Sequence, residues 1–230
     1  MPTIVSWNLC ERPPGSPRKW NYVREGLKAD LLLAQEAVVP ATMRSAHRAG
    51  GIAGRDGKAR RWGSAVVAVT EATKITPVGL AEGTWRGTRL GVAPLDGVGR
   101  GHVAIAKVEL DGYRFTAISA YGLTEFGYAS GTLLRTIADL EPVFDDPDLN
   151  QNILLAGDWN IGTWWSGEDH KYAIREGAAL TLLEAYGLVD CLDRFRRPGR
   201  LDHCPCELGA DCRHIHTFRK AGSQNAHMDD

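Results

Sequence analysis

The stretch ADLLLAQE, residues 29–36, is a continuous apolar run that ends at the charge of Glu36. A run of this kind, without polar alternation, is typical of a strand buried on both faces of a sheet. Such a strand would place Glu36 at its carboxyl end, which is a rigid place to hold a functional side chain. The same pattern recurs in QNILLA, residues 151–156, and Asp158 and Asn160 follow directly after it.

Outward from these two strands, the chain mixes strand signals with helix signals. Alternating β-branched residues predict strands, and apolar residues at three- and four-residue spacing predict helices. The dipeptide Asp111-Gly112 tolerates the positive φ of a tight turn and therefore predicts a β-hairpin. The further expected elements are a strand over 3–8, helices over 17–27 and 41–49, a strand over 64–70, a hairpin over 101–110 and 113–120, helices over 130–144 and 168–186, and a strand over 188–192.

The composition and the mixed order of elements favour one layered α/β domain. With 230 residues, of which 43% are hydrophobic, the chain can bury a sizeable core. No repeat, low-complexity tract or linker divides it, so we interpret residues 1–230 as a single domain with a Cys/His-rich insertion at about 194–216. Because 27 Lys and Arg residues oppose 28 Asp and Glu residues, any contact with nucleic acid must come from local patches.

The sequence shows no membrane span and no disulfide framework. No apolar run approaches the roughly 20 residues that cross a bilayer, and the first residues lack a cationic, apolar leader, so we expect a cytoplasmic protein. The chain has five cysteines, an odd number, which does not suit complete pairing. Cys10 and Cys191 stand alone in apolar surroundings, and we expect both to be small buried residues.

Polar residues at predicted strand ends are candidates for chemistry. A carboxylate such as Glu36 could hold a hard cation, since Mg²⁺ takes one or two carboxylates and leaves other positions for water and phosphate. Asp158 could orient a water, and the amides of Asn8 and Asn160 could donate to phosphoryl oxygens. Each residue also has an ordinary interpretation: an Asx-turn pair for Asp158 and Asn160, a buried turn former for Asn8, and a surface charge for Glu36.

Five short motifs occur in order along the chain: Trp7-Asn8, Gln35-Glu36, Gly157-Asp158-Trp159-Asn160, His216-Thr217-Phe218 and Met228-Asp229. Taken together they resemble those of the endonuclease/exonuclease/phosphatase superfamily, the DNase-like metal-dependent phosphodiesterases. That resemblance implies a four-layer α/β sandwich with two packed mixed β-sheets and a divalent-metal site, for Mg²⁺ or Mn²⁺, at their common edge.

The resemblance also implies a role for each matching residue. Asn8 and Glu36 would lie next to the metal, and Asp158 would activate the attacking water. Asn160 would steady the phosphate, and Asp229 would match the acid that follows the Thr-Phe segment. Tyr121, in ISAYG, stands where the superfamily ends a strand with a functional polar residue.

The chain departs from the superfamily at its end. The superfamily closes with a Ser-Asp-His segment, whereas this sequence stops at Asp230. Either the last strands are missing, or Asp202-His203-Cys204-Pro205 takes their role, although that segment precedes His216 and is in the wrong order. The order favours truncation. Missing strands would leave backbone groups unpaired, so we expect marginal stability or low activity.

The segment between about 194 and 220 offers two further candidate sites. Four sulfur and nitrogen ligands could hold one structural Zn²⁺, although the Cys-x-Cys pair is tight and a reduced loop without metal is the alternative. Basic residues there could bind a phosphate backbone, or they could form a solvated loop. The zinc candidates are Cys204, Cys206, Cys212 and His214, and the candidates for binding substrate are Arg194, Arg196 and Arg197.

Tryptophans could add to a nucleic-acid surface. Trp62, Trp85, Trp164 and Trp165 would stack on bases if they were exposed, but tryptophans are more often packing residues. His47, His102 and His170 are most simply surface or helix residues without a role.

Three functions fit these motifs. The leading hypothesis is a divalent-metal-dependent phosphodiesterase, a nuclease that hydrolyses nucleic-acid phosphodiester bonds. The alternatives are a catalytically impaired binding protein on the same fold, and a phosphatase for a small phosphorylated metabolite or lipid head group. Superfamilies of this kind vary the substrate through loops, so the motifs alone do not separate a phosphatase from a nuclease.

Overall fold

The computed structural model of the chain describes eight segments, which fall into two compact units. The first unit comprises Met1–Tyr121 and Ala138–Asp158, and the second comprises Gly122–Ile137 and Trp159–Asp230. The expected single domain therefore stays a prediction, and the expected insertion at about 194–216 lies outside the described residues. The described residues are 1–10, 17–47, 62–78, 102–124, 129–161, 170–191, 218–219 and 226–227.

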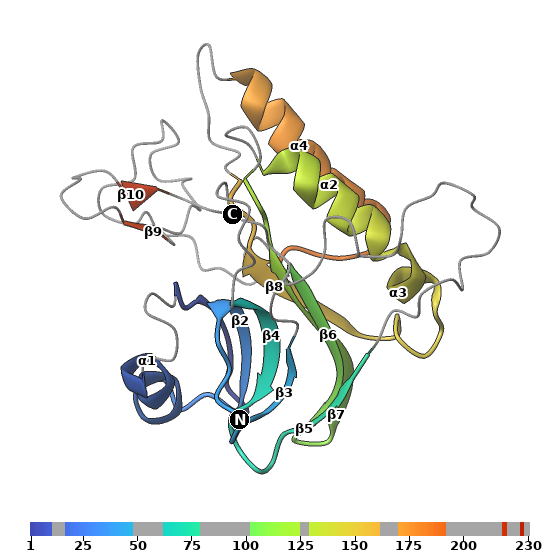
Figure 1. Cartoon of the computed structure of the whole chain (residues 1–230). Helices are drawn as coiled ribbons and strands as arrows, with labels where there is room; N and C mark the ends of the chain where they lie inside the picture. The colour runs from blue at the N-terminus through green and yellow to red at the C-terminus, as the bar shows by residue number, and fades with distance from the viewer. Residues whose placement is uncertain are drawn as a thin grey trace. The chain divides into compact units, whose positions relative to one another are not determined.

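The first unit contains two mixed four-stranded sheets (Figure 1). The first sheet joins β1 to β2 in parallel, β2 to β4 antiparallel and β4 to β3 antiparallel. Its strands, in spatial order, are β1 (Ile4–Asn8), β2 (Leu31–Ala37), β4 (Gly63–Ala68) and β3 (Arg44–His47). Glu36 therefore lies at the carboxyl end of its strand, as the apolar run predicts.

The second sheet has the same mixture of pairings. Strands β5, β6 and β7 pair antiparallel in that order, and β8 pairs parallel with β7. Its strands, in spatial order, are β5 (Lys74–Pro77), β6 (Val103–Leu110), β7 (Tyr113–Tyr121) and β8 (Ile153–Asp158). Each sheet thus contains one parallel pair, and Asn8, Glu36, Tyr121 and Asp158 lie at the ends of these pairs.

An apolar core lies between the two sheets. Leu31 and Leu33 of β2 pack there with Val66 of β4, against Ala106 of β6 and Ala117 of β7. Because alternate residues of a strand point to opposite faces, only one set of side chains from each strand enters this layer. The expected α/β sandwich with two packed mixed sheets is confirmed.

The outer face of the first sheet is covered by a helical segment. The expected helix over 17–27 is found as α1 (Pro17–Asn21) followed by the π-helical turn η1 (Tyr22–Gly26). Trp20 and Val23 from this segment pack on outward-facing residues of β2 and β4. The amide of Leu27 donates to the carbonyl of Tyr22 (2.8 Å), the five-residue spacing of a π-turn.

The predicted hairpin is confirmed. Leu110 of β6 and Tyr113 of β7 are register partners on either side of the turn. Asp111 and Gly112 have φ of 51° and 81°, which are the left-handed values that a two-residue type I′ turn requires. The preferences of these two residues therefore match the conformation that joins the strands.

The parallel pair β7–β8 is close-packed at Gly157. A Cβ atom built on Gly157 would lie 1.8 Å from the carbonyl oxygen of Ala120, the residue that is its register partner. Only glycine fits such an approach, because the obstructing atom belongs to the backbone of the neighbouring strand. Gly157 directly precedes Asp158, so this contact fixes the end of β8 against β7.

The expected helix over 41–49 is wrong over 41–47, the part of it that the structure describes. Residues 44–47 form β3, which pairs antiparallel with β4, and Ala46 is buried in the inter-sheet core. The segment is short and has little propensity of its own, so the unpaired edge of β4 decides its conformation.

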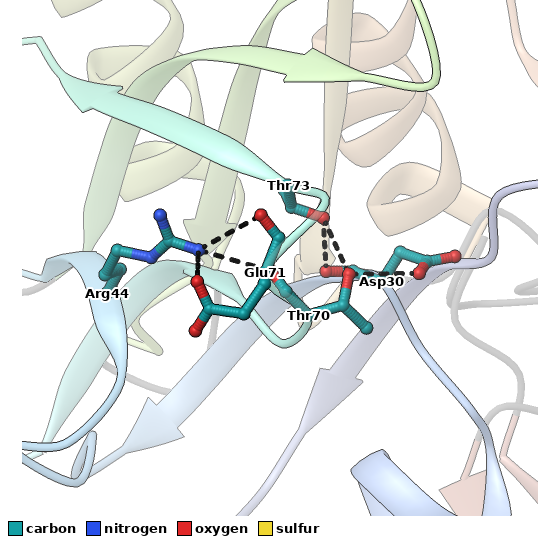
Figure 2. Close-up of polar contacts among 5 residues, drawn as sticks. All are labelled: Asp30, Arg44, Thr70, Glu71 and Thr73. Atoms are coloured by element: carbon teal, nitrogen blue, oxygen red, sulfur yellow. Dashed lines mark hydrogen bonds and ion pairs between the residues drawn. The ribbon is translucent and has the colours of Figure 1, made fainter.

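Polar contacts close the end of the first sheet that lies away from Glu36 (Figure 2). The Thr70 hydroxyl donates to Asp30 Oδ1 (3.1 Å), and the Thr73 hydroxyl donates to the Asp30 carbonyl (2.9 Å). Arg44, at the start of β3, forms an ion pair with Glu71 (3.0 Å). The two threonine contacts hold the β4–β5 turn against the residue that precedes β2, and the ion pair holds the same turn against β3.

The expected helix over 130–144 is divided in two. The chain forms α2 (Ser130–Asp139) and then α3 (Glu141–Asp145), with Pro142 in the first turn of α3. Proline has no amide to continue a preceding helix but fits a first turn, which explains the division.

The expected helix over 168–186 is found as α4 (His170–Ala185). Leu188 donates its amide to the carbonyl of Leu183 (3.1 Å), and Gly187 donates to Glu184 (2.8 Å), so the helix ends in a Schellman motif. The expected strand over 188–192 is wrong over 188–191, since the chain there closes the helix and then forms no strand.

Two short strands, β9 (Phe218–Arg219) and β10 (Ala226–His227), pair antiparallel. The expectation that Cys10 and Cys191 are buried is wrong: both are exposed free thiols, because one follows β1 in a turn and the other follows the end of α4. No helix within the described segments is long and apolar enough to cross a membrane.

Candidate active site at the ends of the parallel strands

Three of the predicted site residues lie in direct contact in the first unit. The Nδ2 atom of Asn8 donates to Glu36 Oε1 (3.2 Å) and to Asp158 Oδ2 (2.5 Å). All three residues are half-buried. Glu36 is 28 residues and Asp158 is 150 residues from Asn8 in the sequence. One amide group therefore joins two carboxylates that are 122 residues apart in the chain.

The parallel pairings explain why these residues meet. Asn8 is the register partner of Gln35 at the end of β1 and β2, and Tyr121 is the partner of Asp158 at the end of β7 and β8. The carboxyl ends of parallel strands lie at the same edge of a sheet, so the last residues of each pair are neighbours.

The orientation of the Asn8 side chain is fixed by its own turn. Asn8 Oδ1 accepts a hydrogen bond from the Cys10 amide (2.8 Å), which closes an Asx-turn. The Leu9 amide donates to the Gln35 carbonyl (2.9 Å), and Lys19 Nζ donates to the carbonyls of Leu9 and Cys10. With its oxygen used in this way, Asn8 presents its NH₂ group to the two carboxylates. Asn8 Oδ1 accepts only this one hydrogen bond among the described contacts and keeps a second lone pair, so the expected place of Asn8 next to the metal stays a prediction.

The carboxylate of Glu36 reaches this cluster because β2 carries an extra residue. Ala34 pairs with Ala65 and Ala37 pairs with Gly63, so three steps along β2 match two along β4. This is a β-bulge, and Glu36 within it has a φ of 46°. Strict alternation would send Gln35 and Glu36 to opposite faces, whereas the bulge allows Glu36 to contact the same amide as Asp158.

Tyr121 lies beside the cluster in an aromatic group. Its ring meets Trp62 edge-on, with 5.6 Å between centroids, and His102 edge-on at 6.3 Å. Its amide donates to the His102 carbonyl (2.8 Å), which also accepts a hydrogen bond from the Ser64 hydroxyl (2.7 Å). Trp62 is a packing residue, only 8% exposed. The surface interpretation of His102 is wrong, since this residue is 1% exposed and packs between strand ends.

The other predicted site residues lie in the second unit or outside the described residues. Asn160 belongs to the second unit, where its Nδ2 donates to the Gly122 carbonyl (2.9 Å) and its φ is 51°. The remaining candidates lie outside the described residues: Asp229, the zinc candidates Cys204, Cys206, Cys212 and His214, and the basic candidates Arg194, Arg196 and Arg197.

The chemistry of the cluster suits a hard divalent cation. Glu36 and Asp158 supply carboxylate oxygens, and one or two carboxylates are the protein ligands that Mg²⁺ ordinarily uses. Within the described ranges, no group of three or more His, Cys, Asp or Glu side chains could hold an ion. Magnesium sites that act on phosphate commonly take one or two carboxylates from the protein and further ligands from water and substrate, which is the donor set that Glu36 and Asp158 offer.

Sequence reasoning missed two residues behind this cluster. The motif Gln35-Glu36 gives Gln35 no role of its own, and Ser119 on β7 belongs to no motif, yet both are buried and hydrogen-bonded to each other. A polar residue inside an apolar run is the signal that could have found Gln35. Ser119 lies in an ordinary alternating strand, so its sequence context carries no such signal.

Comparison with known proteins places the fold. No family model matches the chain, and no curated protein matches it. Among solved structures, it is similar to the endonuclease domain of TRAS1, a telomere-specific non-LTR retrotransposon, at 16% sequence identity and a TM-score of 0.51. The match covers 81% of this chain and 71% of that chain. The chain therefore shares the DNase I-like α/β-sandwich fold of that endonuclease domain.

Proposed function

We propose that this protein is a divalent-metal-dependent phosphodiesterase that hydrolyses nucleic-acid phosphodiester bonds. The observation that carries the proposal is the contact of one amide, that of Asn8, with the carboxylates of both Glu36 and Asp158 at an edge of strand ends. The fold shared with a retrotransposon endonuclease domain supports a nuclease rather than another phosphoesterase.

Each residue of the cluster has a distinct proposed role. Glu36 binds the cation, and Asp158 orients and deprotonates a water for in-line attack. Asn8, locked by its turn, holds the two carboxylates at a fixed separation, and this preorganisation lowers the cost of aligning the water with the phosphate. Mg²⁺ or Mn²⁺, when bound, neutralises charge on the phosphoryl group.

Further residues would complete the site around the phosphate. Tyr121 would contact the phosphate, a role supported by its pairing with Asp158 in the sheet. Asn160 would donate to a phosphoryl oxygen. Asp229 would be the catalytic acid that follows the Thr-Phe segment. Arg194, Arg196 and Arg197 would contact the nucleic-acid backbone outside the cleavage site.

Replacement of Asp158 by asparagine tests the proposal. Asp158→Asn keeps the shape of the side chain but removes the base, so cleavage of supercoiled plasmid in Mg²⁺ should fall by at least about 100-fold, as expected for loss of a general base. The matched control is Asp148→Asn, at an exposed position before β8, which should retain wild-type cleavage. Thermal denaturation of both variants establishes that they are folded.

Two outcomes would contradict the proposal. Equal plasmid cleavage by wild type and Asp158→Asn would show that Asp158 is not the base. A folded wild-type chain that shifts the mobility of DNA in Mg²⁺ without cleaving it would instead support a binding protein on the same fold.

A further inference from the structure

We propose that Gln35 and Ser119 form a clamp between the two sheets that positions the Glu36 carboxylate for metal binding. This inference rests on the proposed function, because it assigns a positioning role within that site. Neither residue touches a cation or a substrate in this role. Both act through the backbone of the bulge in β2.

The clamp consists of three hydrogen bonds in the buried layer between the sheets. Gln35 Nε2 donates to the Leu33 carbonyl (3.1 Å) and to Ser119 Oγ (2.9 Å). Ser119 Oγ donates in turn to the Ala34 carbonyl (2.8 Å). Gln35 is 1% exposed and Ser119 is fully buried. The side chains therefore connect β7 of the second sheet to the backbone of β2 on both sides of Ala34.

The location of the clamp within an apolar core argues for a geometric role. Leu31 and Leu33 precede Gln35 on β2 in the inter-sheet core, and Ala117 precedes Ser119 on β7. Two apolar side chains of similar shape could continue that core without burying polar atoms, and such replacements are often neutral or stabilising. A directional polar pair at this point adds what apolar packing does not, namely a fixed register at the bulge.

The clamp bears directly on the conformation of Glu36. It hydrogen-bonds to the carbonyls of Leu33 and Ala34, which lead into the bulge, and Glu36 follows with a φ of 46°. Glutamate has no local preference for such a φ, so the surrounding structure must stabilise it. Without the clamp, β2 can relax toward regular alternation, which would turn the Glu36 carboxylate away from Asn8.

The clamp also relates the two halves of the site. Ser119 lies on β7, two residues before Tyr121, and β7 pairs with β8, whose end carries Asp158. Glu36 follows Gln35 on β2. A hydrogen bond between Gln35 and Ser119 therefore sets the position of Glu36 relative to the strand pair that holds Asp158.

The test measures metal binding as well as cleavage. In Ser119→Ala, the affinity for Mn²⁺, followed by electron paramagnetic resonance of the free ion, should weaken about 10-fold, which is the lower range for loss of a residue that orients a metal ligand. Plasmid cleavage should lose kcat with little change in KM for DNA. Ser119→Thr keeps the hydroxyl and should recover most of the Mn²⁺ affinity.

Two further variants separate positioning from stability. Gln35→Met keeps the volume of the side chain but removes its hydrogen-bond donors, so it should weaken Mn²⁺ binding as Ser119→Ala does. This variant still tests the clamp if Ser119→Thr does not fold. Thr73→Val is the matched control, since Thr73 is a fully buried residue whose hydroxyl donates to a carbonyl at the other end of the sheet (Figure 2). Thr73→Val should lower Tm and leave Mn²⁺ affinity within twofold of wild type.

The outcomes distinguish failure of the clamp from failure of the proposed function. If wild type binds Mn²⁺ and cleaves DNA, but Ser119→Ala and Gln35→Met bind Mn²⁺ within twofold of wild type, the positioning role is overturned and the proposed function stands. If folded wild type neither binds Mn²⁺ nor cleaves DNA, the proposed function fails, and the positioning role fails with it.

Discussion

Glu36 has a backbone conformation that its own side chain disfavours. Its φ of 46° lies in the left-handed region, where a residue with a Cβ atom pays about 1 to 2 kcal/mol relative to ordinary helical or extended values. Strained residues of this kind gather at functional sites, where the surrounding structure imposes them. The candidate metal ligand is therefore held in place at the expense of stability.

This strain predicts an unusual order of stabilities at position 36. Without a carboxylate in either variant, Glu36→Gly should be more stable than Glu36→Ala by about 1 kcal/mol, because glycine adopts positive φ freely. The matched control is Lys107, which is exposed on β6 and does not have a positive φ. At this position the alanine variant, Lys107→Ala, should be more stable than the glycine variant, Lys107→Gly. Urea denaturation in a chelator measures all four variants. An alanine variant at position 36 as stable as the glycine variant would show that the backbone is not strained.

The identity of the candidate site residues could be predicted from the sequence. The backbone bulge and the buried hydrogen bonds that position them could not. Asn8, Glu36 and Asp158 all follow or end predicted strands, and the structure joins them through one amide. The bulge that turns Glu36 could not be predicted, because an extra residue in a strand depends on pairing with β4. Ser119 could not be linked to Gln35, since that contact joins residues 84 positions apart.

At the scale of elements, the turn between β6 and β7 is specified by its own residues. Gly112→Ala should lower the free energy of unfolding by about 1 kcal/mol, because alanine disfavours the φ of 81° at this position. Steric overlap adds nothing to this cost, since a Cβ at Gly112 meets no atom within 4 Å. Gly131→Ala is the control: it lies in α2, also has no atom within 4 Å of a Cβ, and should raise stability by up to about 1 kcal/mol. Urea denaturation should show opposite signs for the same chemical change. Equal effects at the two glycines would contradict this account.

Elements were predictable where local sequence and tertiary pairing agree. The hairpin and the helix α4 were confirmed because a turn dipeptide and a cap lie at the expected places. The segment 44–47 was predicted as a helix but pairs with β4, because a short segment with weak preference follows its neighbour. Pro142 divides a helix that apolar spacing alone predicted as continuous.

At the scale of the whole molecule, a nearly neutral chain must attract nucleic acid through a local patch. Joint replacement of Arg194, Arg196 and Arg197 by alanine should reduce the slope of log affinity against log salt concentration by about 2 to 3, one counterion for each lost phosphate contact. Fluorescence anisotropy with labelled duplex DNA, in the Asp158→Asn background to prevent cleavage, measures this slope. The control is Arg24→Ala, an exposed arginine already paired with Glu25 (2.9 Å). An unchanged slope in the triple variant would exclude these arginines from the interface.

The layered α/β class could be predicted from the buried apolar runs and the hairpin, because only a layered fold buries both faces of such strands. The two packed mixed sheets were implied by the resemblance to the superfamily, and the domain count stays a prediction. The expectations of missing last strands, of marginal stability and of a cytoplasmic location stay predictions. Denaturation of the wild-type chain in urea tests the second of these directly.

The contact at Gly157 has a consequence for how this fold could change over time. A Cβ at this position would lie 1.8 Å from the carbonyl oxygen of Ala120, inside the strand pair that ends in Tyr121 and Asp158. In a library with residues 156–158 fully randomised and selected for folding, only glycine codons should survive at the middle position, whatever happens to catalysis. A glycine immediately before the acid is thus a landmark by which distant relatives with little other similarity could be aligned to this chain.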